Sequence, residues 1–237
     1  TQKKGLSLVN PFRAPKGRRS NQLNIAPVMV VGLGRFGISL ASELTSNGVE
    51  VLGVDSNAKV VRESAPFLTE AVVADATDAD ALAQLGLEDI KHVVLAVGNQ
   101  LEASILTASN LIESGVPDVW AKANSEAHGR ILKQLGVHHV VHPERDTGRR
   151  VAHLLGGQFR EFAEIAPGYS VTCMSAPAAL VEQRKPLDSV WRDKGVQIIA
   201  VRGADGDFHP ITPETVIAPS DIIIAGGSPA ALENLTR

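Results

Sequence analysis

A chain of 237 residues with 44% hydrophobic but only 4% aromatic residues has room for one large domain or two modest ones, with a core rich in Val, Ala, Leu and Ile. The net charge of −3 is unevenly distributed, because residues 1–26 hold six of the 23 basic residues and no acid. Residues 27–237 are therefore acidic, and such a domain is poorly suited to bind nucleic acid. The single cysteine, Cys173, excludes an internal disulfide and fits a reducing compartment. No uncharged apolar run approaches the ~20 residues of a membrane-spanning helix, and we expect no secretory signal.

The first 26 residues are expected to form a flexible basic extension. Pro11, Pro15 and Gly17 interrupt any regular element, and the basic residues between positions 13 and 19 follow no helical or strand period. A solvated arm without fixed structure is the simpler interpretation. The alternative is electrostatic contact of the arm with anionic lipid head groups or with an acidic partner.

The stretch 28–55 organises the rest of the chain. It begins with the apolar run 28–31, turns through the sequence GLGRFG at 32–37, and continues as a helical pattern that ends at Asn47-Gly48. A second apolar run, 51–54, is followed by Asp55. A strand, a glycine-rich turn, a helix and a second strand with an acid at its end form the dinucleotide-binding motif in its required context.

The glycines and the acid of this motif have distinct physical roles. Gly32 allows a sharp turn out of the strand, Gly34 lets a phosphate approach the backbone, and Gly37 lets the helix pack closely on the strand. The start of the helix directs its free N–H groups at the phosphate. Asp55, 18 residues after Gly37, can accept hydrogen bonds from both ribose hydroxyls and disfavours the 2′-phosphate of NADP. A tight turn without a ligand is the alternative interpretation.

Strands and helices continue to alternate after Asp55. The alternation predicts an α/β fold, a Rossmann-like doubly wound parallel sheet in the order 3-2-1-4-5-6 with a ligand site where the order reverses. We expect strands at 71–74, 92–97, 119–122 and 137–141, and helices at 57–65, 78–85, 101–114 and 124–135. The residues that follow the strands are then brought to one edge of the sheet; they include Asp55, Asp75, 97–99, Lys122 and Glu144.

The pattern changes in the last third of the chain. A helix at 144–157, with Arg149 and Arg150 on its basic face, is expected to connect a domain at 27–143 to a smaller one at 158–237. In the smaller domain, short strand-like runs and one helix predict an α+β fold. The runs lie at 159–165, 170–174, 196–201 and 222–225, and the helix lies at 187–194.

Patterns that carry catalytic chemistry are missing from the sequence. It contains no nucleophile elbow, no GxxxxGK[ST] loop and no paired zinc-binding cysteines. His138, His139 and His142 are close in sequence, but neighbours on a strand face opposite ways, so joint metal binding is not expected. We therefore expect no enzyme; an NAD-dependent oxidoreductase is the alternative, and it lacks a visible base or hydride-positioning group.

Four motifs in order resemble those of a known family. They are GLGRFG at 32–37, VVADATD at 72–78, WAKA at 120–123 and HPERDTG at 142–148. Together with the closing stretch 196–227, they resemble the RCK (regulator of potassium conductance) domain, in particular the cytosolic regulatory subunits of bacterial Ktr/Trk potassium-uptake systems. The resemblance covers residues 28 to about 235.

The resemblance implies a nucleotide site at the expected sheet edge. Its residues would be Gly32, Gly34, Arg35, Phe36, Gly37, Asp55, Asn57, Asp75, Ala76, Val97, Gly98, Lys122 and Glu144. Arg35 would reach the terminal phosphates, often across a subunit interface, and Lys122 would add charge there. Asn57, Asp75 and Ala76 would lie near the adenosine.

Glu144 would lie near the γ-phosphate and help to hold Mg²⁺ or another cation, because carboxylate oxygen suits hard cations. An arginine, a lysine and a carboxylate at one phosphate end suit ATP or ADP better than a nicotinamide, and NAD or NADH is the alternative ligand. Some relatives bind cyclic di-AMP in the small domain, where Val190, Arg192 and Ile199 occupy the corresponding region; a plain dimer interface is the alternative there.

The resemblance also implies a mechanism of switching rather than chemistry. Homodimers formed through the connecting helix would assemble into an octameric ring beneath an integral membrane potassium-translocating subunit. The chain would then be cytoplasmic and peripheral on the inner face of the cell membrane. ATP and ADP would favour different ring shapes, which requires different affinities for the two states. A nucleotide sensor for a partner that is not a channel is a further alternative.

Overall fold

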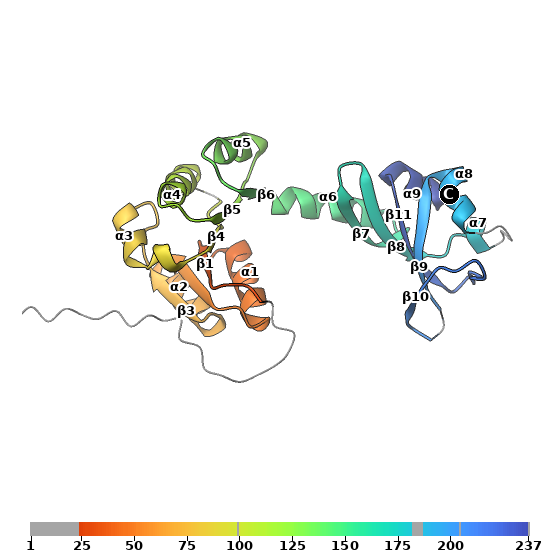
Figure 1. Ribbon diagram of the computed structural model, residues 1–237, viewed down its shortest axis with the longest axis horizontal. Coiled ribbons are helices and arrows are strands. Elements are labelled where there is room, and N and C mark those ends of the chain that lie inside the picture. The colour runs from red at the N-terminus through yellow and green to blue at the C-terminus, as the bar shows by residue number, and fades with distance from the viewer. Residues whose placement is uncertain (1–23, 99, 182–186, 204, 237) are drawn as a thin grey trace, which may run out of the picture. The chain divides into compact units, whose positions relative to one another are not determined.

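The computed structural model describes residues 24–98, 100–181, 187–203 and 205–236 (Figure 1). Residues 1–23 of the predicted basic extension therefore lie outside the described residues. The chain divides into two compact units, one ending at Pro143 and one beginning at Glu144, and each is considered by itself. Within the described part of the chain, no helix is both long enough and apolar enough to cross a bilayer.

The first unit contains the six-stranded parallel sheet that the sequence predicts. Its strands lie in the order β3-β2-β1-β4-β5-β6, so the order reverses between β1 and β4. The strands are β1 Val28–Val31, β2 Val51–Asp55, β3 Glu70–Val73, β4 His92–Leu95, β5 Asp118–Lys122 and β6 His139–Val141. The predicted fold class is confirmed. Strand β4 ends at Leu95, two residues earlier than expected.

Five α-helices and two short 3-10 turns connect these strands. They are α1 Arg35–Ser46, α2 Ala58–Ser64, α3 Ala79–Gln84, α4 Leu101–Glu113 and α5 Glu126–Gln134, with turns η1 Ala65–Phe67 and η2 Leu87–Asp89. Side chains cap two of these helices: Asn57 accepts a hydrogen bond from Lys59 N at 2.9 Å at the start of α2, and Asp78 accepts one from Asp80 N at 2.9 Å at the start of α3.

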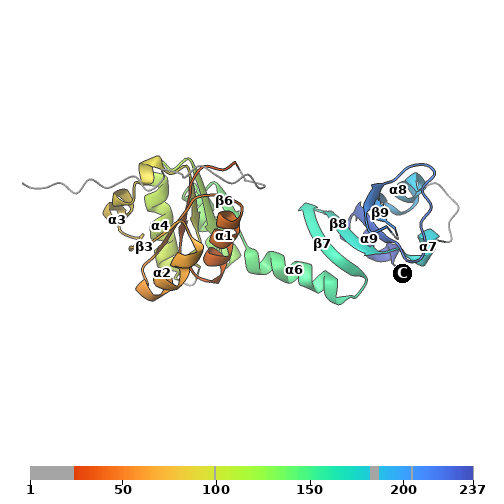
Figure 2. The ribbon, with the colours of Figure 1, turned by 90° about the horizontal axis from the view of Figure 1, so that it is seen from below.

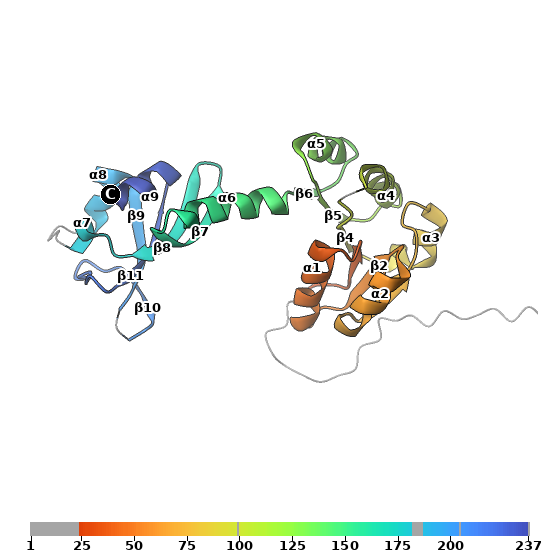
Figure 3. The ribbon, with the colours of Figure 1, turned by 180° about the vertical axis from the view of Figure 1, so that it is seen from behind.

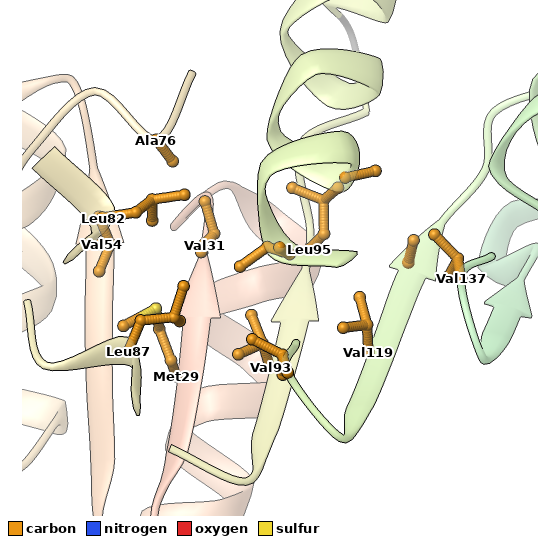
Figure 4. Packing of buried hydrophobic residues seen from close by; sticks show 14 of the residues in the cluster. Met29, Val31, Val54, Ala76, Leu82, Leu87, Val93, Leu95, Val119 and Val137 are labelled. Carbon is orange, nitrogen blue, oxygen red and sulfur yellow. The ribbon is translucent and has the colours of Figure 1, made fainter. Parts of the chain in front are cut away.

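The central strand β1 is buried on both faces, which explains its uninterrupted apolar sequence. Met29 and Val31 belong to a core with side chains of α3, α4 and α5, and part of this core is shown in Figure 4. Val28 and Val30 belong to a second core with side chains of α1 and α2. Figure 3 shows α1 and α2 on one side of the strands, with α4 and α5 on the other. The sheet is thus covered by helices on both faces.

The second unit is an antiparallel sheet with helices (Figure 2). Its strand order is β10-β9-β11-β8-β7. Its strands are β7 Phe159–Ala166, β8 Tyr169–Ser175, β9 Val196–Arg202, β10 Phe208–Pro210 and β11 Ile222–Gly227. Its helices are α6 Pro143–Leu155, α7 Ala178–Val181, α8 Asp188–Lys194 and α9 Pro229–Leu235. Sequence patterns predict all of these except β10, α7 and α9.

Helix α6 is fixed to the sheet of the second unit. His153 stacks on Phe162 with ring centroids 3.9 Å apart, and its Nδ1 lies 3.3 Å from a carboxylate oxygen of Glu233. Two further ion pairs join α6 to β7, Arg149 with Glu164 and Arg150 with Glu161. The helix expected at 144–157 is therefore present, and it packs as a part of the second unit.

Candidate functional site

The glycine turn between β1 and α1 contains two glycines that the protein's own packing requires. Gly32 has a φ of +91°, and a Cβ there would lie 2.9 Å from Cγ2 of Val97. A Cβ on Gly37 would lie 1.9 Å from the carbonyl oxygen of Gly32. Helix α1 can therefore begin this close to the end of β1 only with glycine at both positions.

Gly34 differs from these two glycines because nothing in the fold requires it. It caps α1 with a φ of −68° and a ψ of −173°, a conformation that any residue can adopt. It is exposed, and no atom lies within 4 Å of the place a Cβ would take. The first turn of α1 contains no acidic residue. The positive end of a 12-residue helix thus faces open space, as an anion-binding site requires.

Asp55, at the end of β2, has its carboxylate fixed beside this turn. Its Oδ2 accepts a hydrogen bond from Leu33 N at 2.8 Å, and its Oδ1 accepts one from Asn57 N at 2.8 Å. Each carboxylate oxygen retains capacity for a further donor. The acid is therefore oriented before any ligand binds, which reduces the entropy cost of accepting ribose hydroxyls. Asn57 itself is exposed and uses its side-chain oxygen to cap α2.

The turn after β3 carries Asp75 and Ala76. Asp75 is exposed, and its Oδ1 accepts hydrogen bonds from Thr77 Oγ1 at 2.7 Å and Thr77 N at 3.0 Å. These bonds lower the pKa of the Asp75 carboxyl below its usual value of 3.8. Ala76 is buried in the core and anchors the turn. The backbone N–H of Ala74 donates to Asp55 O at 3.1 Å, so the turn after β3 lies next to the end of β2.

The other side of the turn is formed by the ends of β4 and β5. Val97 packs against Gly32, and Gly98 lies so close to Asn124 that a Cβ would meet the side-chain oxygen at 2.6 Å. Lys122 is 9% exposed, and its ammonium group lies 5.8 Å from the ring centroid of Phe36 on α1. The lysine thus adds positive charge near the start of α1, at the point where the strand order reverses.

Asn124 is supported in turn by a buried histidine. Nδ1 of His128 accepts a hydrogen bond from Asn124 N at 3.4 Å, and only 2% of His128 is exposed. Burial lowers the pKa of the His128 imidazole, and the charge of His142 lowers it further. Neither Asn124 nor His128 is singled out by sequence patterns, although the asparagine directly after the WAKA strand was an available signal.

The structure brings most of the predicted site residues to one edge of the first unit. These are Gly32, Gly34, Arg35, Phe36, Gly37, Asp55, Asn57, Asp75, Ala76, Val97, Gly98 and Lys122. Arg35 is the first residue of α1 and is exposed. Glu144 is exposed in the first turn of α6 and belongs to the second unit, so its role at the phosphates and at a cation stays a prediction.

The residues of the predicted second ligand site lie in the second unit, and two of the histidines have partners in the first. Val190 is buried in the core of the second unit, whereas Arg192 and Ile199 are exposed; cyclic di-AMP binding there stays a prediction. His138 accepts a hydrogen bond from Val119 N, and His139 pairs with Asp118. Among the described residues, no three His, Cys, Asp or Glu side chains are grouped so that they could hold a metal ion.

Comparison with known proteins agrees with this arrangement. Residues 28–143 match the TrkA-N domain. The chain is 38% identical over 202 residues to the Ktr system potassium uptake protein C of Bacillus subtilis (strain 168), covering 84% of this chain and 90% of the relative. It is 34% identical over 206 residues to the Ktr system potassium uptake protein A of Vibrio alginolyticus, covering 86% and 94%.

Among solved structures, the RCK domain of GsuK shares the fold, with a TM-score of 0.60 at 18% sequence identity. The match covers 94% of this chain and 50% of the GsuK chain, so this chain spans about half the length of that neighbour. From the domain match and the two relatives above 30% identity, this chain belongs to the RCK family of TrkA-N domain proteins that includes the Ktr system potassium uptake proteins.

Proposed function

We propose that this chain is a nucleotide-sensing, peripheral gating subunit that binds ATP or ADP at the carboxyl edge of its six-stranded sheet and regulates a membrane potassium transporter or channel. The observation that carries the proposal is Gly34. The fold does not need a glycine there, yet the residue leaves open space in front of the positive end of α1. A phosphate group is the ligand that such a space suits best.

The charges around the turn support an adenosine phosphate. Asp55 is held ready for a ribose with free hydroxyls, and its negative charge would repel a 2′-phosphate. Arg35 begins α1 and Lys122 lies beside Phe36, so both cations are near the phosphate end. Two cations favour the concentrated charge of a di- or triphosphate over the nicotinamide half of NAD. Mg²⁺ would accompany the phosphates, with Glu144 as a ligand.

Gating requires that ATP and ADP bind with different relative affinities to two states of the assembly. Each tenfold difference corresponds to about 1.4 kcal/mol, and nearly complete switching needs about 10⁴-fold. Arg35 is suited to read the γ-phosphate because its guanidinium binds phosphate oxygens in pairs. We place the chain in a homodimer and an octameric ring on the cytoplasmic face of a membrane potassium-translocating subunit, acting by conformational change rather than by catalysis.

Calorimetric titration of the full chain with ATP, ADP, NAD and NADH, with and without Mg²⁺, tests the proposed ligand. We expect ATP and ADP to bind more tightly than NAD or NADH. Arg35→Ala should weaken ATP binding about tenfold or more, by removing a charge-assisted contact, whereas Arg130→Ala, a matched exposed arginine on α5, should leave it unchanged.

Two results would argue for the alternatives. Selective NAD or NADH binding that does not depend on Arg35 would overturn the adenosine-phosphate assignment and favour an NAD-dependent oxidoreductase. ATP and ADP binding without co-purification of any membrane potassium-translocating protein would favour a nucleotide sensor for a different partner.

A further inference from the structure

The turn that follows β3 is held by a side chain from a distant helix. Asn110, in the interior of α4, donates from Nδ2 to the carbonyl oxygen of Thr77 at 2.9 Å and lies 3.5 Å from that of Ala76. The contact spans 33 residues of sequence. Asparagine is a poor helix former, so its presence within a 13-residue helix costs helix stability that this tertiary contact can offset.

Apolar packing holds the same turn against the same helix. Ala76 is 8% exposed and belongs to one core cluster with Ala108 and Leu111, which lie two positions before and one position after Asn110 in α4. A hydrogen bond and a core contact therefore fix the turn from the α4 side. Within the turn, both donors of Thr77 hold Asp75 Oδ1.

This arrangement leaves Asp75 with one committed and one available oxygen. Its Oδ2 accepts no hydrogen bond from any residue that the structure describes. The usual pKa of the carboxyl, 3.8, is lowered further by the bonds from Thr77, so the group is ionised at neutral pH. The turn lies one strand beyond Asp55, joined to it by the Ala74–Asp55 backbone bond of 3.1 Å. If a nucleotide binds with its ribose at Asp55, its base would therefore lie near the turn after β3.

A fixed carboxylate distinguishes the two purines. Adenine presents a 6-amino group, which donates to a carboxylate, whereas guanine presents a 6-oxo group, which is an acceptor and is repelled. The discrimination depends on how firmly the carboxylate is held, because a mobile side chain can turn away from the wrong base.

We propose that Asn110 is a positioning residue that fixes the Asp75 turn and thereby sets a preference of the site for adenine over guanine nucleotides. The inference rests on the proposed function, since it assumes that a nucleotide binds at this edge. Asn110 acts through Asp75 and the backbone of the turn, without touching the ligand.

The experiment compares the affinities of ATP, GTP and inorganic tripolyphosphate for the full-length protein and for Asn110→Leu. Leucine has nearly the shape of asparagine but no donor, and Asn110→Asp, which also loses the amide donor, is the second variant. We expect ATP affinity to fall about tenfold, which corresponds to the loss of one partly buried hydrogen bond. Tripolyphosphate affinity should not change. The ratio of ATP affinity to GTP affinity should fall, because only the ATP affinity depends on the fixed Asp75 carboxylate. Ser109→Ala, on the same helix, is the control.

A double-mutant cycle separates positioning from a general structural role. If Asn110 acts through Asp75, Asn110→Leu should not change the ATP-to-GTP ratio further in an Asp75→Ala background. Equal losses for ATP, GTP and tripolyphosphate, or an unchanged ratio in both Asn110 variants, would overturn the inference while the proposed function stands. Failure of the unaltered protein to bind ATP would overturn both.

Discussion

Replacing Gly34 with alanine should separate ligand binding from folding more cleanly than any other change in this chain. The new Cβ would meet no atom within 4 Å, and the φ of −68° is one that alanine adopts freely. The same replacement at Gly37 would place a Cβ 1.9 Å from the carbonyl oxygen of Gly32. Two glycines of one motif, three residues apart, should therefore respond in opposite ways.

The expected magnitudes follow from the contacts. For Gly34→Ala, the loss of unfolded-state freedom stabilises the fold by about 0.4–1 kcal/mol, while the poorer helix cap costs a similar amount, so stability should change by less than about 1 kcal/mol. For Gly37→Ala, the clash with backbone should cost about 1–3 kcal/mol or more, which lowers the melting temperature by several degrees. In the ligand complex, the Cβ at position 34 would occupy the place of a phosphate and remove one or more charge-assisted hydrogen bonds. Each bond contributes about 1.5–3 kcal/mol, so ATP affinity should fall about 10- to 150-fold.

Thermal unfolding and calorimetric ATP titration of the two variants measure both effects. Ser39→Ala, at an exposed position on α1, controls for general effects on the helix. If Gly34→Ala folds normally and binds ATP as tightly as the unaltered protein, the open space before α1 does not hold a phosphate and the reasoning is refuted. If Gly34→Ala fails to fold, the structural argument for open space is wrong.

Two further predictions concern the acid of the site and a buried histidine. Asp55→Ala removes the carboxylate that would accept the ribose hydroxyls and that now accepts the Leu33 and Asn57 N–H groups. ATP affinity should therefore fall at least about tenfold, while the affinity for tripolyphosphate persists. Equal losses for both ligands in calorimetry would contradict a ribose contact. The imidazole of His128 has a lowered pKa because it is buried and because His142 is nearby, so below about pH 6.5 the unfolded chain binds a proton that the folded chain does not. The free energy of unfolding should therefore decline as pH falls below 6.5, by up to about 1.4 kcal/mol per pH unit. Urea unfolding of His128→Gln should show a weaker decline. If the variant and the unaltered protein lose stability equally as pH falls, His128 is not the group responsible.

The first unit was predictable because its signals are local. The apolar runs, the glycine turn and the capping residues Asn57 and Asp78 lie within a few positions of the elements they define. In the second unit, β10 has three exposed residues and no alternating pattern, so nothing local marks it as a strand. Helix α9 did carry a signal, since Ser228 caps it and Pro229 begins it.

The sequence predicts candidate residues for the site, but it does not predict the contacts that hold them. The motif predicts that Gly34 leaves room for a phosphate and that Gly37 lets the helix pack closely on the strand. The distances are what the motif does not contain: a Cβ on Gly37 would lie 1.9 Å from Gly32 O, whereas a Cβ on Gly34 would meet no atom within 4 Å. The support that Asn110 gives to the turn after β3 joins residues 33 positions apart, and no sequence period relates them. Such a long-range contact depends on how the side chains of α4 pack against the turn, which the local pattern does not contain.

The central claim is that a nucleotide bound at the glycine turn sets the state of a membrane potassium-translocating partner. The most direct test is potassium flux through proteoliposomes that hold the co-purified partner and this chain, with ATP or ADP on the side of the chain. We predict that flux differs between ATP and ADP, and that Gly34→Ala abolishes the difference at concentrations that saturate the unaltered protein. Flux that is the same with ATP, with ADP and without nucleotide, although both ligands bind, would contradict the account.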